Sequence, residues 1–134
     1  MLLNMEAPMN SAIVVHPDFD HTWPWVADRM REIWLQQGPV QFVRVPYAEN
    51  LPAHAVLKDH AQVVRLACFG VAFTDESLAL MTGLREIAAL LPKDSPLVRR
   101  LAEAGVRLIG QKGEGFWGES CAEFALALTV CGLR

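Results

Sequence analysis

The sequence predicts one α/β domain built on a parallel sheet. It has 134 residues, 52% hydrophobic and 20% charged, which is enough apolar material for one core without disulfides or metal. Short, wholly apolar segments rich in β-branched residues alternate with segments whose apolar residues recur every three or four positions. Wholly apolar strands are typical of parallel sheets, because helices cover both of their faces.

The first half of the chain predicts two strands and one helix. The run AIVVH (residues 12–16) is the first expected strand. Thr22 is expected to cap a helix with Pro24 in its first turn, and Gly38 to end it. The run VQFVRV (40–45), closed by a proline, predicts the second strand.

The second half continues the alternation. VVRLACFG (63–70) predicts a strand, Thr74 the cap of a short helix over 75–81, and the first part of LREIAALL (84–91) a fourth strand. A helix opening at Pro96 and ending at Gly105 leads to a fifth strand, VRLIG (106–110). This order predicts a flavodoxin-like, three-layer domain with a parallel five-stranded sheet, whose ligands bind at the carboxyl ends of the strands.

The last segment predicts a long apolar helix. Ser120 followed by Glu123 is a capping box, and the residues over 121–133 are apolar nearly all round. Such a helix needs cover from more than one side, which implies a partner. We therefore divide the chain into a domain over 1–118 and a helix over 119–134 that crosses towards another domain.

This segment carries a resemblance to a known family. Ser120, Cys121, Ala122, Glu123, Phe124, Ala125, Leu126, Ala127, Leu128 and Arg134 match the helix that leaves the N-terminal domain of D-isomer-specific 2-hydroxyacid dehydrogenases. Arg65, Gly70, Val71 and Thr74 are similar to that family's third strand and the loop after it. The resemblance spans 12–134. The sequence departs from the family at Leu91–Asp94, where a Gly-rich loop with an Asp-Asn pair is usual, and at Trp117, where Asn is usual.

The resemblance implies an N-terminal, substrate-side domain of an NAD-dependent oxidoreductase that interconverts 2-hydroxy and 2-oxo acids. Backbone amides at Phe69, Gly70 and Val71 would orient the substrate carboxylate, and the hinge or interface would include Trp117, Ser120, Glu123, Phe124 and Leu128. The family's nucleotide loop and its catalytic Arg, Glu and His lie beyond this helix, so no catalytic residue is expected here. NAD is expected only in the complete enzyme, and the chain alone is expected to be an inactive, homodimer-forming half.

A second function class remains open. The chain could instead be a free-standing flavodoxin-like binding or dimerisation module without catalysis, pairing through its last helix. Gly113–Gly118 has GxGxxG spacing, but it follows no convincing first Rossmann strand, and a glycine-rich hinge is the preferred interpretation.

Other candidate groups have simpler explanations. His16–His21 holds two imidazoles and two carboxylates and could bind a metal, but Asp18 and Asp20 also suit a helix N-terminus. His54 and His60 are expected to be solvated. The cysteines are expected to be buried thiols: Cys68, Cys121 and Cys131. Of the tryptophans, Trp23 and Trp34 are predicted to share a core-facing stripe, and Trp25, Phe116 and Trp117 to face a second domain or subunit.

The charge balance argues against two classes of partner. Twelve Lys and Arg against 15 Asp and Glu, scattered along the chain, make a net charge of −3 and no basic patch for nucleic acid or anionic lipid. No apolar run reaches the length of a membrane-spanning helix, and the first ten residues lack the features of a secretory signal. A cytoplasmic location without a membrane partner is therefore expected.

Overall fold

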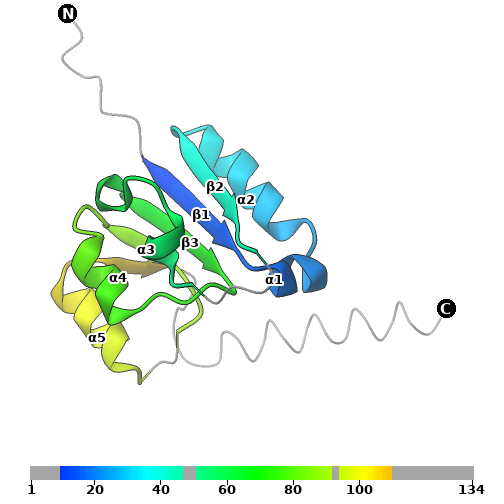
Figure 1. The fold of residues 1–134 in the computed structure, drawn as a ribbon. Helices are drawn as coiled ribbons and strands as arrows, with labels where there is room; N and C mark the ends of the chain where they lie inside the picture. The colour runs from blue at the N-terminus through cyan, green and yellow to red at the C-terminus, as the bar shows by residue number, and fades with distance from the viewer. Residues whose placement is uncertain (1–9, 47–50, 92–93, 110–134) are drawn as a thin grey trace, which may run out of the picture.

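The structure is a computed structural model that describes residues 10–46, 51–91 and 94–109. The described strands form one sheet in the order β2-β1-β3-β4-β5, and every neighbouring pair is parallel (Figure 1). This confirms the α/β fold with a parallel five-stranded sheet, and its strand order is that of flavodoxin-like doubly wound sheets. The strands are β1 (Ser11–Val15), β2 (Val40–Arg44), β3 (Arg65–Phe69), β4 (Glu86–Ala88) and β5 (Arg107–Ile109).

Helices cover both faces of this sheet. Figure 1 shows α1 and α2 on one side and α3, α4 and α5 on the other, which makes three layers. The helices are α1 (Pro17–Thr22), α2 (Val26–Leu35), α3 (Ala53–Val56), the 3₁₀ turn η1 (His60–Gln62), α4 (Asp75–Leu80) and α5 (Pro96–Glu103).

The two cores follow from the alternation of side chains along the central strands. In β1, Ala12 and Val14 pack under α3–α5, whereas Ile13 and Val15 pack under α1 and α2. All four side chains are fully buried. A strand buried on both faces is mainly apolar on both, which explains why the residues over 12–15 show no polar alternation; the buried Ser11 hydroxyl accepts a hydrogen bond from Arg65.

The helix starts predicted for the second half are confirmed. The Thr74 hydroxyl accepts a hydrogen bond from the Ser77 N–H at the start of α4, and Ser95 accepts one from Leu97 at the start of α5, where Pro96 is the first residue. Gly105, at φ +77°, follows the end of α5 in the left-handed conformation that a helix C-terminus favours.

The helix predicted after Thr22 is wrong in its start. Two helices occupy this region, because His16 caps α1 directly after β1: its side chain accepts a hydrogen bond from the Asp18 N–H. Thr22 ends α1 instead of capping a helix, and its hydroxyl donates to the Asp18 carbonyl at 3.0 Å. The second helix begins only at Val26, beyond Pro24.

The predicted crossing helix over 119–134 lies outside the described residues. So do its interface residues Trp117, Ser120, Glu123, Phe124 and Leu128, together with Phe116, Cys121, Cys131 and the segment Gly113–Gly118. Among the residues that the structure does describe, no helix is long and apolar enough to span a membrane.

Candidate functional site

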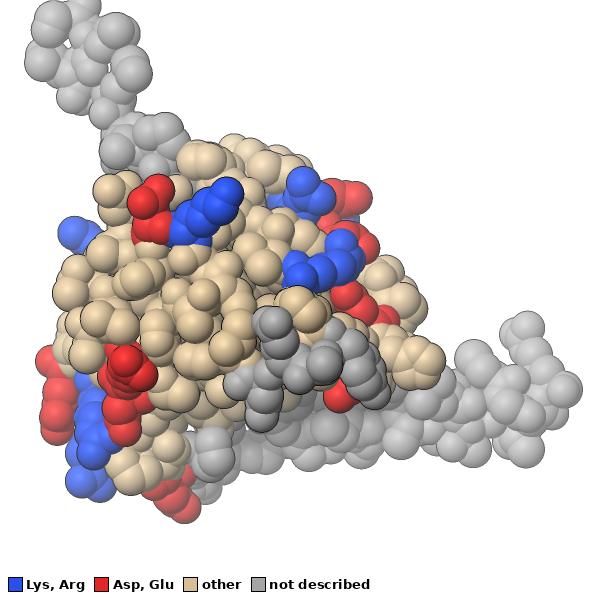
Figure 2. Space-filling view, in the orientation of Figure 1, with Lys and Arg blue, Asp and Glu red and all other residues tan. Residues whose placement is uncertain are grey.

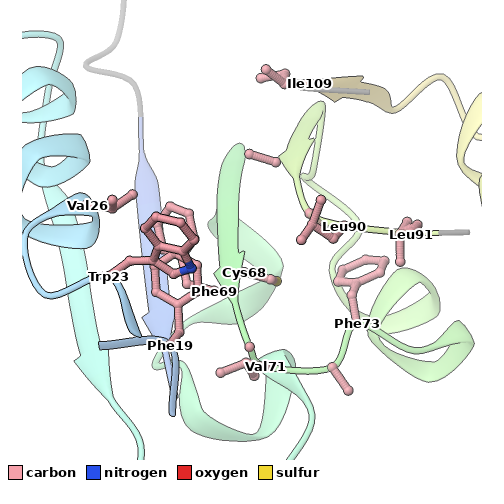
Figure 3. A pocket seen from close by; sticks show the side chains of 14 residues that line it. Phe19, Trp23, Val26, Cys68, Phe69, Val71, Phe73, Leu90, Leu91 and Ile109 are labelled. Atoms are coloured by element: carbon pink, nitrogen blue, oxygen red, sulfur yellow. The ribbon is translucent and has the colours of Figure 1, made fainter. Parts of the chain in front are cut away.

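A cavity of about 750 Å³ opens at the carboxyl ends of the strands. Its walls come from α1, the start of α2, the loops that follow β3 and β4, and the end of β5 (Figure 3). This is the edge where doubly wound sheets bind their ligands, next to the point between β1 and β3 where the strand order reverses. The lining residues are Phe19, Trp23, Val26, Cys68, Phe69, Gly70, Val71, Ala72, Phe73, Ala88, Ala89, Leu90, Leu91 and Ile109.

The loop after β3 passes close over the end of β1. The His16 N–H donates to the Phe69 carbonyl at 2.8 Å, which ties the two strand ends together. Gly70 follows with φ +76°, and a Cβ placed on it would lie 3.0 Å from the Cβ of His16. Glycine is therefore required here both by the backbone conformation and by the space.

This loop offers backbone donors beside the cavity. Within the part of the chain that the structure describes, the backbone N–H groups of Gly70, Val71 and Ala72 have no hydrogen-bond acceptor. Val71 is a buried residue at 8% exposed, whereas Gly70 and Ala72 are exposed. Buried N–H groups are nearly always paired, and successive N–H groups left open by a turn can bind an anion such as a carboxylate.

The structure brings the three predicted substrate-contacting residues together in this cavity. Phe69, Gly70 and Val71 all line it. The other half of the site comes from Phe19 on α1 and from Leu90 and Leu91 after β4. Phe19 and Leu91 lie in the loops 16–21 and 91–94, where the sequence predicts ligand binding at the carboxyl ends of strands, whereas Leu90 was not singled out. Its position just after a strand's carboxyl end was the available signal.

Aromatic rings form one wall of the cavity. The rings of Phe19 and Phe69 stack with centroids 4.6 Å apart and planes inclined by 24°. Figure 3 shows the Trp23 indole beside them, with Phe73, Leu90 and Leu91 on the opposite side of the cavity.

The predicted stripe shared by two tryptophans is wrong. Trp34 is buried in the core of the α1–α2 layer, as predicted, but Trp23 is half-buried at the end of α1 and lines the cavity. The break between α1 and α2 separates the two residues, so they do not lie on one helix. Trp25, predicted to face a partner, is 66% exposed.

Cys68 is a buried thiol, as predicted. Burial raises its pKa to about 12, so the thiol stays protonated near neutral pH. A thiolate is the nucleophilic form, and Cys68 is therefore unsuited to nucleophilic catalysis although it lines the cavity.

The acidic residues after β1 serve the fold. Arg44, at the end of β2, donates to Asp20 at 2.7 Å and to both carboxylate oxygens of Asp28 at 3.1 and 3.2 Å. The hydrogen bond to Asp20 is the main cause that raises the pKa of Arg44. His21 is exposed within α1. No group of three or more His, Cys, Asp or Glu able to hold a metal occurs among the described residues.

His54 is not solvated, contrary to the expectation from sequence. It is 8% exposed, and its Nδ1 lies 2.7 Å from the hydroxyl of the fully buried Ser77. The ring also makes an edge contact with that of His60, at 6.1 Å between centroids. The sequence analysis did not predict the short helix α3, which places His54 beside Ser77 on α4.

A buried cation lies at the opposite edge of the sheet. Arg65, the first residue of β3, stacks on the Trp34 ring at 4.0 Å and donates to Ser11 and Gln37 at 3.1 and 2.6 Å. Burial lowers the pKa of Arg65. Since its polar contacts are internal and lie at the amino ends of the strands, Arg65 supports packing and does not belong to the cavity.

The described residues do not fit the pyrophosphate of NAD. Phosphate binding after the first strand of such a sheet needs close backbone approach and a helix N-terminus free of negative charge. Here His16 and Pro17 occupy the turn, and Asp18 and Asp20 lie in the first turn of α1. Figure 2 shows charges of both signs around the margin of the visible face, without a broad positive patch.

Comparison with protein-family models, with curated proteins and with solved structures finds no match to this chain.

Proposed function

We propose that this chain is the substrate-side domain of an NAD-dependent oxidoreductase similar to the D-2-hydroxyacid dehydrogenases. The observation that supports it best is the loop at 69–72. Its unpaired N–H groups and left-handed glycine lie at the switch point of a 2-1-3-4-5 parallel sheet, where the resemblance expects carboxylate binding.

The division of labour follows from the chemistry of the cavity. None of its described lining side chains is an acid, a basic group or a nucleophile that ionises near neutral pH. The chain's own role is therefore to bind and orient a 2-oxo or 2-hydroxy acid and to exclude water from it. The cofactor would supply the hydride, and a second domain would supply the proton-transfer and carboxylate-binding side chains.

The proposal is tested on the reading frame that contains this sequence. We expect it to continue past Arg134 into a strand followed by a GxGxxG loop, and the encoded protein to oxidise NADH with a 2-oxo acid. The 134-residue chain alone is expected to show no turnover. A reading frame that stops at Arg134 contradicts the proposal and favours the binding-module alternative, as does NADH oxidation by the 134-residue chain.

A matched pair of variants tests the role of the loop. Ala72→Asp in the longer protein adds a carboxylate beside the unpaired N–H groups, and we expect the KM for a 2-oxo acid to rise roughly tenfold or more. Ala79→Asp adds the same charge at an exposed position on α4, away from the cavity, and is expected to leave KM unchanged. Equal effects of the two substitutions would contradict carboxylate binding at this loop.

A further inference from the structure

The residues that line the cavity indicate what kind of substrate side chain it can bind, in addition to the carboxylate. Among its described lining side chains, none is charged, and the polar ones are the Cys68 thiol and the Trp23 indole. Away from the backbone N–H groups of the loop after β3, a charged or hydroxylated substituent would meet almost only apolar side chains, at a cost that disfavours its binding. The group that enters must be apolar.

The shape of the wall favours a ring. The stacked pair of Phe19 and Phe69 presents an aromatic surface, and Phe73 and Leu90 face it across the cavity (Figure 3). Aromatic side chains bind further rings by offset or edge-to-face contacts, in addition to the gain from apolar burial.

The volume of the cavity also favours a bulky apolar group. A volume of about 750 Å³ lies within the range of sites for small organic molecules. The methyl group of a three-carbon acid would leave most of this space and its apolar wall without contact, whereas an arylmethyl or long branched group would cover it.

Leu90 supports an occupant of this kind. It lines the cavity and yet is 70% exposed, the largest exposed fraction among the large hydrophobic residues described. The loop after β4 continues the apolar wall with Ala88, Ala89 and Leu91, so Leu90 is one part of a continuous surface and not an isolated exposed residue.

We infer that the substrate is a 2-oxo or 2-hydroxy acid with a bulky apolar side chain, aromatic or long and branched. Its carboxylate lies at the unpaired N–H groups of the loop after β3, and its side chain lies between the aromatic wall and Leu90. This inference rests on the proposed function, because the acid group comes from that proposal and the side chain from the cavity.

Calorimetric titration of the 134-residue chain with three probes tests it. The probes are 3-phenyl-2-oxopropanoate, pyruvate and 3-phenylpropan-1-ol, which vary the ring and the acid independently. We expect the aryl oxo acid to bind roughly tenfold or more tightly than either of the others. Leu90→Gln is expected to weaken its binding severalfold, while Leu80→Gln, exposed on α4 outside the cavity, leaves it unchanged.

The outcomes separate the two proposals. Pyruvate binding as tightly as the aryl oxo acid overturns the inference about the side chain and leaves the proposed function intact. The neutral alcohol binding as tightly as the aryl oxo acid overturns carboxylate recognition, and with it the proposed function. Absence of binding by all three probes, or equal effects of Leu90→Gln and Leu80→Gln, overturns the inference.

Discussion

Gly70 holds the loop after β3 in the position where its backbone can meet a ligand. Two glycines of the described residues have nearly the same positive φ, +76° at Gly70 and +77° at Gly105, but their surroundings differ. A Cβ at Gly70 would meet His16 at 3.0 Å, whereas a Cβ at Gly105 would have no atom within 4 Å. Comparing substitutions at Gly70 and Gly105 therefore separates the cost of backbone strain from the cost of a steric clash.

Alanine at these two positions should have unequal effects on stability. Gly105→Ala carries the cost of a left-handed alanine, about 1–2 kcal/mol. Gly70→Ala carries the same cost and also forces the loop away from His16, so we expect it to lower the free energy of unfolding by about 1 kcal/mol more. Urea denaturation of both variants measures the difference. Equal losses would show that the loop does not lie against β1 as described.

At the scale of elements, Ser77 joins two short helices. Its hydroxyl lies 2.7 Å from His54 Nδ1 on α3 and 3.1 Å from the Thr74 hydroxyl, and it accepts from the Thr74 N–H at 3.2 Å. The side chain is fully buried, so the cap of α4 and its packing against α3 depend on one group. This pair of helices supports the end of the loop that lines the cavity.

Removing this hydroxyl should cost more than removing an ordinary helix cap. Ser77→Ala leaves the buried His54 Nδ1 and the partly buried Thr74 N–H without their partner, and we expect a loss of about 2–3 kcal/mol. Ser95→Ala removes a single capping bond to Leu97 in a less buried place and should cost about 1 kcal/mol. Thermal unfolding of the two variants compares them. A smaller loss for Ser77→Ala would contradict its linking role.

The elements could be predicted from sequence where local signals are strong. The apolar strands, the cap at Thr74 and the helix start at Pro96 depend on neighbouring residues, and the structure confirms them. The split between α1 and α2 was missed because Thr22 is a common N-cap residue and His16 is not. In the structure His16 caps α1, and Thr22 is the last residue of that helix. The burial of His54 depends on Ser77, 23 residues away, which no local pattern reports.

The residues of the candidate site differ in the same way: some could be predicted from nearby sequence, and others depend on contacts between distant segments. Phe69, Gly70 and Val71 were predicted on resemblance, and their loop forms one end of the cavity. Phe19, Trp23 and Leu90 come from three other segments, and only the strand order brings them to the same edge. An amphipathic pattern cannot distinguish a side chain that lines a cavity from one that fills a core, since both are apolar.

At the scale of the whole molecule, the proposed binding site and the buried Arg65 lie at opposite edges of the sheet. The amino edge carries the buried Arg65 with its contacts to Ser11, Gln37 and Trp34. The carboxyl edge carries the cavity and the unpaired N–H groups. We propose that the described residues form a scaffold with a ligand-binding site at the carboxyl edge of the sheet, and that a carboxylic acid binds there.

Backbone amide shifts of the ¹⁵N-labelled 134-residue chain, recorded during titration with 3-phenyl-2-oxopropanoate, test that claim most directly. The account predicts that the largest shifts occur at the amides of Gly70, Val71 and Ala72 and at the Trp23 indole, with little change at Arg65 and its neighbours. Shifts centred on the amino edge of the sheet, or spread evenly over the surface, would contradict it.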